Sequence, residues 1–482
     1  MESDRIYWNI CEECNGSGRV KKRLSKKLRA QNQAASHPFK KIVGEDGSLI
    51  RTKPHLYKCL NCDGSGLVSS ENPPLVNNNY PHIAIIGAGI GGVALAVACL
   101  HRGIPFTLYE RDNSFDDRSQ GYGLTLQQAS KAIEGLGIMS LTEGVFSTRH
   151  LVHTTDGKVI GEWGVRKLMQ SLDQTPSKRR NIHIARQSLR LALLEQLGGQ
   201  HTVQWGHQLI DFKVGEDKRV ELSFYVKGKM QCAKADLVVG ADGIRSSVRR
   251  LLIDENANPL RYLGCMVILG ICPLSRLEAL ENSLLDSATV FQTANGNERI
   301  YIMPYSSDAI MWQLSFPITE NEAKVLSAQG AKALKEEACR RTQWHKPIPQ
   351  ILAATLEAQI SGYPAYDRAL LSPELLEKAG ALTLIGDAAH PMSPFKGQGA
   401  NQALLDALVL ARGIAKGCRP SSNWKEMGLR AMVLTEFESE MLARSASKVK
   451  DSAEAAEFLH SETVLQQGDM PRGWFSKKKD ML

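Results

Sequence analysis

A glycine-rich stretch, HIAIIGAGIGGVALAVACL at residues 82–100, limits the fold more than any other part of the sequence. An apolar run ends in the spacing Gly-x-Gly-x-x-Gly, through Gly87, Gly89 and Gly92, and a second apolar run follows. This pattern predicts a strand, a tight turn and a helix, in which the glycines let the backbone turn, approach a pyrophosphate and pack helix on strand. Glu110 ends the next apolar run, where a carboxylate can accept hydrogen bonds from ribose hydroxyls. The stretch therefore predicts a Rossmann-like dinucleotide site.

Strand and helix signals keep alternating along the chain. Two further apolar runs, in ADLVVGADGIRSSVRR at 235–250 and ALTLIGDAAHPMSPFKGQGANQALLDALVLAR at 381–412, end in Asp-Gly or Gly-Asp. This order predicts a parallel α/β core. Residues 254–373 differ, because runs such as RIYIMPY and AIMWQLSFP are rich in β-branched and aromatic residues and predict an antiparallel sheet. Residues 423–460 are rich in Ala, Glu, Lys and Leu and predict helix.

Three of these motifs, taken in order, resemble those of a known enzyme family. GAGIGG with Glu110, then GADGIRSSVR, then GDAAHPMSPFKGQGAN resemble the class A flavoprotein monooxygenases over roughly residues 81–420. The last motif is most similar to the tetracycline-inactivating and salicylate-type branches. The resemblance implies an FAD-dependent monooxygenase that uses NAD(P)H and O₂ to hydroxylate an aromatic or polycyclic small molecule through a flavin C4a-hydroperoxide.

The resemblance also assigns FAD contacts residue by residue. They are Gly87, Gly89, Gly92, Glu110, Arg118, Arg186, Asp242, Gly243, Asp387, Gly399, Ala400 and Asn401. A surface ion pair is the competing interpretation for Arg118 and Arg186. The resemblance names no catalytic side chain, because the flavin itself performs the chemistry.

The substrate is expected between the flavin and the sheet of residues 254–373. In AIMWQLSFP, Met311 and Gln313 alternate with Trp312 and Leu314, so one set faces the substrate and the other faces the core. The sequence leaves open which set does which. Two further candidates, in the flavin loop, are Pro394 and Phe395.

Two phrases near the N-terminus, CEECNGSG and CLNCDGSG, repeat the pattern Cys-x-x-Cys-x-Gly-x-Gly. Four thiolates, from Cys11, Cys14, Cys59 and Cys62, would fill every position of a tetrahedral Zn²⁺ and so predict a structural site. The trailing Gly-x-Gly resembles the zinc-binding repeats of DnaJ-type chaperones. The 44 residues between the pairs exceed the usual spacing, and a redox dithiol pair is the alternative.

These features predict an α/β protein in which a Rossmann-like FAD-binding domain is interleaved with an antiparallel β-sheet substrate domain. A small zinc module precedes them and helices follow. The expected boundaries are 1–72 for the zinc module, 73–80 for a linker, 81–147, 183–253 and 374–420 for the FAD-binding domain, 148–182 and 254–373 for the substrate domain, and 421–482 for the C-terminal helical region.

Composition narrows the class of protein to which the chain can belong. Hydrophobic residues make up 43% and charged residues 23%, as in soluble globular proteins. Residues 1–80 hold 13 Lys and Arg against 8 Asp and Glu, an excess too small to predict nucleic-acid binding. Neither a signal peptide nor a membrane span is visible, and ten cysteines do not suggest a disulfide scaffold, so we expect a cytoplasmic enzyme.

The expected partners are an aromatic small molecule and O₂. The zinc module leaves a protein partner open, because chaperone-like zinc modules bind polypeptides. The alternative function is therefore a flavin hydroxylase whose protein or peptide substrate is recruited by that module.

Overall fold

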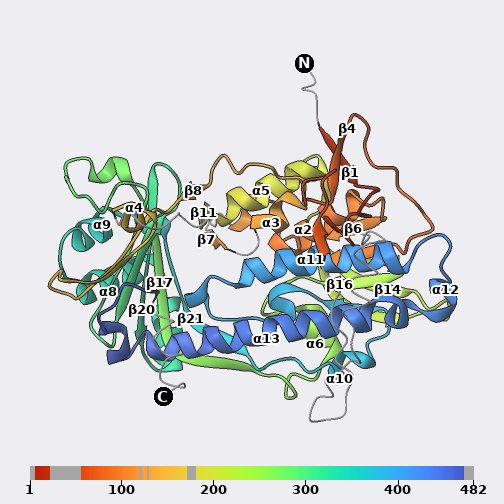
Figure 1. Cartoon of the computed structure of the whole chain (residues 1–482). Helices are drawn as coiled ribbons and strands as arrows, with labels where there is room; N and C mark the ends of the chain where they lie inside the picture. Colours follow the sequence, from red (N-terminus) through yellow and green to blue (C-terminus); the bar gives the residue numbers. More distant parts are fainter. Residues whose placement is uncertain (1–5, 22–55, 119–121, 128–129, 171–180, 472–482) are drawn as a thin grey trace, which may run out of the picture. The chain divides into compact units, whose positions relative to one another are not determined.

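The structure is a computed structural model that describes residues 6–21, 56–118, 122–127, 130–170 and 181–471 (Figure 1). The chain divides into two units, Met1–Leu75 and Val76–Leu482. In the described ranges, no helix combines the length and the apolar character that crossing a membrane requires.

A five-stranded parallel sheet forms the centre of the larger unit. Its strand order is β12 (Val203–Gln204), β6 (Phe106–Tyr109), β5 (Ile83–Ile86), β16 (Leu237–Gly240) and β22 (Leu382–Leu384). Helix α2 (Ile90–Leu100) follows the glycine turn and packs against α5 (Arg186–Leu197) and α11 (Gly399–Gly417). Strands β5, β16 and β22 are buried throughout, as their runs of Ile, Leu and Val predict. The predicted Rossmann-like α/β core is thus confirmed.

A larger sheet of seven strands forms the second layer of this unit and appears at the left of Figure 1. Its order is β10 (Val159–Trp163), β9 (Arg149–His153), β18 (Thr289–Ala294), β19 (Arg299–Pro304), β20 (Ala309–Pro317), β17 (Leu260–Pro273) and β21 (Ile360–Arg368). Every pair is antiparallel except β9 with β18, which is parallel. The sheet is therefore mixed at one point where the sequence predicted only antiparallel pairing.

One face of this sheet packs on helices. Trp312, Leu314 and Phe316 of β20 lie in a buried cluster with side chains of α8 (Gly330–Arg341) and α9 (Ile348–Ala354). Because side chains alternate along a strand, Met311 and Gln313 face the opposite way. The sequence had left this choice open.

Two three-stranded antiparallel sheets and a long C-terminal helix complete the larger unit. Helix α13 (Thr435–Phe458) packs along α11 and reaches β17 (Figure 1). The sheets are β7 (Gly123–Leu126), β11 (Ile182–Ala185) and β8 (Val145–Phe146), and β13 (Gln208–Val214), β14 (Val220–Val226) and β15 (Lys229–Ala235). The other α-helices are α3 (Ser130–Glu134), α4 (Val165–Gln170), α6 (Ser247–Leu252), α7 (Glu320–Ala328), α10 (Glu374–Glu377) and α12 (Trp424–Met427).

In its described residues, 6–21 and 56–75, the smaller unit has two short antiparallel ribbons that carry the cysteine phrases. Strand β1 (Tyr7–Ile10) pairs with β4 (Leu67–Ser70), and β2 (Arg19–Lys21) pairs with β3 (Leu56–Lys58). The four cysteine side chains make up its buried cluster, against which Val20 and Val68 pack. Among the described residues of this unit, so small an apolar cluster cannot hold the ribbons together without another source of free energy.

Candidate functional site

In the turn between β5 and α2, two glycines are required by close contacts with the protein backbone. Gly87 has a φ of +105°, and a Cβ there would lie 2.7 Å from the carbonyl oxygen of Ala241. A Cβ at Gly92 would lie 1.8 Å from the carbonyl oxygen of Gly87, so only glycine lets the helix pack this close. At Gly89, by contrast, the nearest atom would be Nη2 of Arg186, at 3.6 Å. Space therefore remains beside Gly89 for a ligand.

Charged side chains hold this turn in place. The Glu110 carboxylate accepts hydrogen bonds from the backbone N–H groups of Ala88, at 2.8 Å, and Asp112, at 3.1 Å. The buried Arg190 donates from Nε to the Ala88 carbonyl at 2.7 Å. Sequence reasoning missed Arg190, although its place one helical turn after Arg186 is a signal.

The beginning of α2 is left open to an anion. No side chain caps it, and its first turn contains no acidic residue. Arg186 lies beside the turn, with its guanidinium 6.0 Å from the ring centre of Tyr122. Arg118 is the last residue of a single 3₁₀ turn, Asp116–Arg118. Its side chain lies outside the described part of the chain.

Asp242 lies two residues after the end of β16 and organises the start of α6. Its carboxylate accepts hydrogen bonds from the Ser246 hydroxyl and, at 2.6 Å, from the Ser247 backbone N–H. Gly243 follows with a φ of +82° and open space where a Cβ would stand. The buried Arg249 of α6 then donates to the Ala388 carbonyl at 2.7 Å, which ties this motif to the one after β22.

Asp387, three residues after the end of β22, lines a cavity, and its carboxylate has no hydrogen bond to any described residue. Burial raises the pKa of its carboxyl, against the opposing charges of His390 and Arg186. Its Oδ1 lies 3.4 Å from where a Cβ of Gly399 would stand. The side chain is exposed to the cavity, where an unpartnered carboxylate is suited to accept hydrogen bonds from a bound hydroxyl.

Helix α11 begins at the same place, and Asn401 fixes its position. The Asn401 amide accepts a hydrogen bond from the Gln127 N–H at 2.9 Å, and it donates to the carbonyls of Thr125, at 2.9 Å, and Gly397, at 2.8 Å. No side chain caps the helix, its first turn has no acidic residue, and Gly399 and Ala400 line the cavity. The positive end of the helix is thus free to face a ligand.

A buried network of charged side chains supports the loop that follows β22. Asp406 of α11 accepts hydrogen bonds from Nε2 of His390 at 2.7 Å, from the Gly386 N–H at 2.9 Å and from Nη2 of Arg444 at 2.7 Å. Sequence reasoning missed this network, although an Asp within the apolar run ALLDALVL was a signal.

The cavity has a volume of about 970 Å³ and lies between the large sheet and the loop after β22. Among the predicted substrate residues, Met311, Gln313, Pro394 and Phe395 all line it. The predicted FAD residues that line it are Asp387, Gly399 and Ala400. The remaining sheet side chains on this wall include Val290, Gln292, Arg299, Tyr301, Met303 and Tyr363.

A line of neutral histidines runs along one side of the cavity. Thr125 contacts Nδ1 of His183 at 3.0 Å, and Nε2 of His183 contacts the Ser147 hydroxyl at 2.8 Å. Nε2 of His150 lies 3.2 Å from the same hydroxyl. Burial lowers the pKa of His183 to about 3 and that of His150 to about 4, so both rings are uncharged at neutral pH.

The four N-terminal cysteine sulfurs lie within 4.8 Å of one another. The Sγ atoms of Cys11 and Cys59 are 3.8 Å apart, and those of Cys14 and Cys62 are 3.7 Å apart. Sulfurs at about 2.3 Å from a tetrahedral Zn²⁺ are separated by about 3.8 Å, so the set fits this metal.

The glycines of the two cysteine phrases interlock. The backbone N–H groups of Gly18 and Gly66 each donate to a cysteine Sγ at 3.2 Å. A Cβ at Gly18 would lie 2.2 Å from the Gly64 carbonyl oxygen, and one at Gly66 would lie 2.5 Å from that of Gly16. Each phrase thus requires the glycines of the other.

Residues 81–423 match the protein family described as FAD binding domain. Among curated proteins, the aurachin C monooxygenase/isomerase of Stigmatella aurantiaca is 27% identical over 337 residues, which cover 68% of this chain and 79% of that protein. The 3-amino-4-hydroxybenzoate 2-monooxygenase of Streptomyces platensis is 29% identical over 341 residues, which cover 70% of this chain and 80% of that protein.

Two solved structures are similar in fold. HpxO of Klebsiella pneumoniae, complexed with FAD and uric acid, aligns with a TM-score of 0.65 and 20% identity over 84% of this chain and 95% of that chain. PqsL of Pseudomonas aeruginosa, in complex with 2-aminobenzoylacetate, aligns with a TM-score of 0.61 and 24% identity over 80% of this chain and 98% of that chain. At these identities the likeness concerns the fold alone.

Proposed function

Because the chain belongs to the FAD binding domain family, we propose that it is an FAD-dependent monooxygenase that hydroxylates an aromatic or polycyclic small molecule with NAD(P)H and O₂. The observation that carries this proposal is the cavity of about 970 Å³, whose two sides have different chemistry. The loop after β22 forms one side, and a sheet wall with aromatic, thioether and amide side chains forms the other. Such a space suits a flat, largely apolar ligand beside a flavin.

The residues of the larger unit fit FAD. The space beside Gly89, the uncapped start of α2 and the nearby Arg186 suit the two phosphates. Asp387 has a free carboxylate for a ribityl hydroxyl, and the start of α11 suits the negative charge of a reduced flavin. When bound, FAD takes electrons from NAD(P)H and activates O₂. The other predicted FAD contacts, among them Glu110, Asp242, Gly243 and Asn401, are proposed to shape this site through the backbone segments that they hold.

The relatives support a small-molecule substrate. One is named for 3-amino-4-hydroxybenzoate and another for aurachin C, and neither name refers to a polypeptide. We propose that Met311 and Gln313 contact the substrate from the sheet, and Pro394 and Phe395 from the loop. The alternative of a protein or peptide substrate has no observation in its favour.

We further propose that the smaller unit binds one Zn²⁺ through Cys11, Cys14, Cys59 and Cys62. The sulfur separations support this, and four sulfur ligands leave no open position for catalysis. The metal would stabilise the fold of the unit, and the flavin chemistry would proceed without it.

The proposed reaction predicts that one oxygen atom of O₂ enters the product. Aromatic compounds that fit the cavity should also raise the rate of NAD(P)H oxidation, because the protein supplies a dry, oriented site for them. Mass spectrometry of the product formed under ¹⁸O₂, with a parallel reaction in labelled water, makes the test. Label that comes from water alone would contradict the proposal.

Replacing Asp387 with alanine should weaken FAD binding roughly ten- to a hundredfold. A hydrogen bond to a charged group contributes about 1.5–3 kcal/mol, and Asp387 has no other partner among the described residues. Retained flavin absorbance and the Kd of FAD measured on the apoprotein test this. The Asp387→Asn variant keeps the shape and removes the charge, so its Kd should lie in between. Wild-type affinity in the alanine variant would rule out the assigned contact.

A further inference from the structure

Arg299 is a buried cation in the wall of the cavity. It begins β19, is only 5% exposed, and borders the cavity together with Gln292 and Tyr301. Burial lowers the pKa of its guanidinium to about 10, which still leaves it charged at neutral pH. A buried charge is costly unless something pairs with it, so its partner matters.

The protein orients Arg299 without neutralising it. Its Nε donates to Oε1 of Gln292 at 2.7 Å, and the guanidinium lies 4.9 Å from the ring centre of Tyr301. Within the described residues, no carboxylate forms an ion pair with it, and neither Nη atom has a hydrogen-bond partner. The two carboxylates that line the cavity, Asp387 and Asp451, make no ion pair with Arg299 either.

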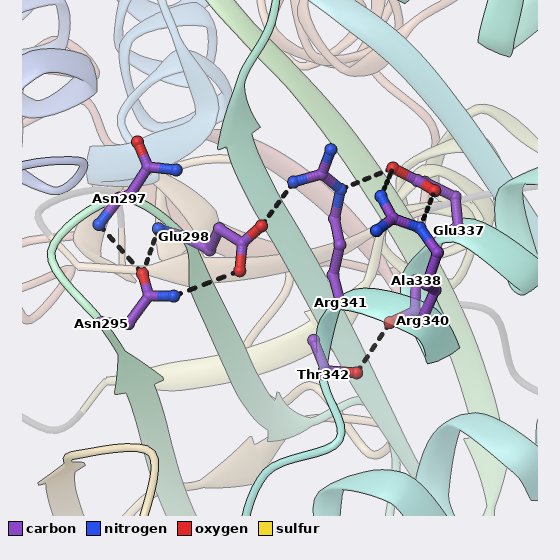
Figure 2. Close-up of polar contacts among 8 residues, drawn as sticks. All are labelled: Asn295, Asn297, Glu298, Glu337, Ala338, Arg340, Arg341 and Thr342. Atoms are coloured by element: carbon purple, nitrogen blue, oxygen red, sulfur yellow. Dashed lines mark hydrogen bonds and ion pairs between the residues drawn. The ribbon is translucent and has the colours of Figure 1, made fainter.

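The arginine on the other side of the sheet is paired quite differently. Figure 2 shows Arg341 of α8 between two carboxylates, Glu298 and Glu337. Glu298 directly precedes Arg299 in the chain, yet its carboxylate pairs with Arg341 (Figure 2). The nearest acidic residue in sequence is therefore already used, and the Arg299 charge is left for something in the cavity.

Three other cations line the cavity, Arg245, Lys396 and Lys448, but none of them lies on the large sheet and none is buried. Arg299 is therefore the buried cation of the sheet wall. His460 contacts the Ser315 hydroxyl at 2.9 Å on the strand next to β19, and its pKa is lowered, chiefly by burial and also by the Arg299 charge. Burial likewise lowers the pKa of His150 and of His183, so both rings are neutral. An arginine presents a planar fork of N–H groups that matches a carboxylate with two parallel hydrogen bonds.

We infer that the aromatic substrate carries an acidic group, a carboxylate or an equally charged acidic hydroxyl, and that Arg299 binds it with Gln292 and Tyr301 holding the guanidinium in place. This inference rests on the proposed function, because it names the class of substrate for the same cavity. It makes Arg299 a binding and specificity residue.

The test compares aromatic carboxylates with their carboxamides, such as salicylate with salicylamide and 1-hydroxy-2-naphthoate with its amide. Binding to the FAD-loaded, full-length protein is measured by titration calorimetry, which needs no turnover. The acids should bind at least about tenfold more tightly than the amides, since hydrogen bonds to charged groups are about twice as strong as neutral ones.

Two variants of Arg299 and one control complete the design. Arg299→Gln should lose the preference for acids and leave amide binding within about twofold, whereas Arg299→Lys should retain part of it because the charge remains without the fork. Arg250→Gln, which removes the same charge at an exposed position of α6, should keep the wild-type preference. Each variant is first checked for FAD content and melting temperature.

The outcomes separate this inference from the proposed function. Acids and amides that bind wild type equally well, or that both fail to bind, would overturn the inference, as would a folded Arg299→Gln variant that still prefers acids. Hydroxylation of amides as readily as acids would leave the monooxygenase standing without the anion site. Selective binding of acids that never accelerates NAD(P)H oxidation would leave the anion site standing and count against the monooxygenase.

Discussion

Replacing Asp406 with alanine is expected to lower the free energy of unfolding of the larger unit by about 3–5 kcal/mol. The carboxylate is fully buried and accepts hydrogen bonds from His390, Arg444 and the Gly386 N–H. Its loss leaves Nε2 of His390 and the Gly386 N–H, both buried, without their carboxylate partner, in the turn that places Asp387 in the cavity. For roughly 400 residues, this corresponds to a fall in melting temperature of about 5 °C, together with weaker FAD binding.

The ion pair between Arg444 and Glu440 supplies a matched control for this prediction, because it joins the same arginine to a second carboxylate. The Arg444 Nε lies 3.0 Å from a Glu440 oxygen, but Glu440 is exposed at the surface of α13. Glu440→Ala should therefore cost no more than about 1 kcal/mol and leave FAD binding unchanged. Thermal unfolding of both variants with and without added FAD makes the comparison. Equal losses in the two variants would contradict a special role for the buried carboxylate.

The effect of pH follows from two opposite pKa shifts. Burial alone would raise the pKa of Asp406, but His390 and Arg444 outweigh it and hold the pKa below the ordinary 3.8. This contribution to stability is present above pH 3.8 and lost as the pH falls through the lowered value. Burial alone would lower the pKa of His390, but Asp406 outweighs it and raises the pKa above the ordinary 6.5. That contribution is full below pH 6.5 and lost as the pH rises through the raised value, so the stability gap between wild type and Asp406→Ala is widest between about pH 4 and 6.5.

The parts of the fold that the sequence predicted are those in which a local pattern carries a local constraint. The spacing of Gly87 and Gly92 located the turn between strand and helix, because a Cβ at either position would collide with the backbone. The apolar runs located the strands of the parallel sheet, because strands buried on both faces need such runs. The parallel pairing of β9 with β18 was missed, since these strands are far apart in the chain and pairing direction leaves no mark on composition.

The site was less predictable, because its charges are defined by partners distant in sequence. Gly399 and Asp387 could be named from their motif, whereas the pairing of Asp406 with Arg444 joins residues 38 positions apart. Nothing in the sequence RIYIMPY distinguishes the buried Arg299 from an arginine at the surface. Only the structure places Glu298 on Arg341 and leaves Arg299 unpaired against the cavity. Likewise, alternation along β20 predicted that one set of side chains faces the substrate and the other faces the core. The buried cluster around Trp312 shows which set faces the core.

The double variant Cys11→Ser with Cys59→Ser should contain no zinc, whereas the wild-type chain should contain one zinc ion. The four sulfurs lie within 4.8 Å of one another, two pairs of them are already at the separation that a tetrahedral ion requires, and each replacement removes a thiolate ligand. Because the ribbons at residues 6–21 and 56–70 bury so few apolar side chains, metal binding should supply the free energy that folds them. Structural zinc sites in peptides contribute about 10–16 kcal/mol at pH 7, so the unit should unfold without the ion.

The control for the zinc prediction is a second double variant, Cys232→Ser with Cys339→Ser, which removes two thiols outside the cysteine cluster. Its zinc content should stay at one ion per chain. Elemental analysis of protein purified without chelators gives the zinc content, and limited proteolysis reports whether residues 6–21 and 56–70 become cleavable. FAD content should be the same in all three proteins, because the proposed flavin contacts lie within residues 87–401. Zinc that persists in the Cys11 and Cys59 variant, or that is missing from the wild-type chain, would reject the site. Loss of FAD along with zinc would instead mean that the flavin site depends on the zinc-bound unit.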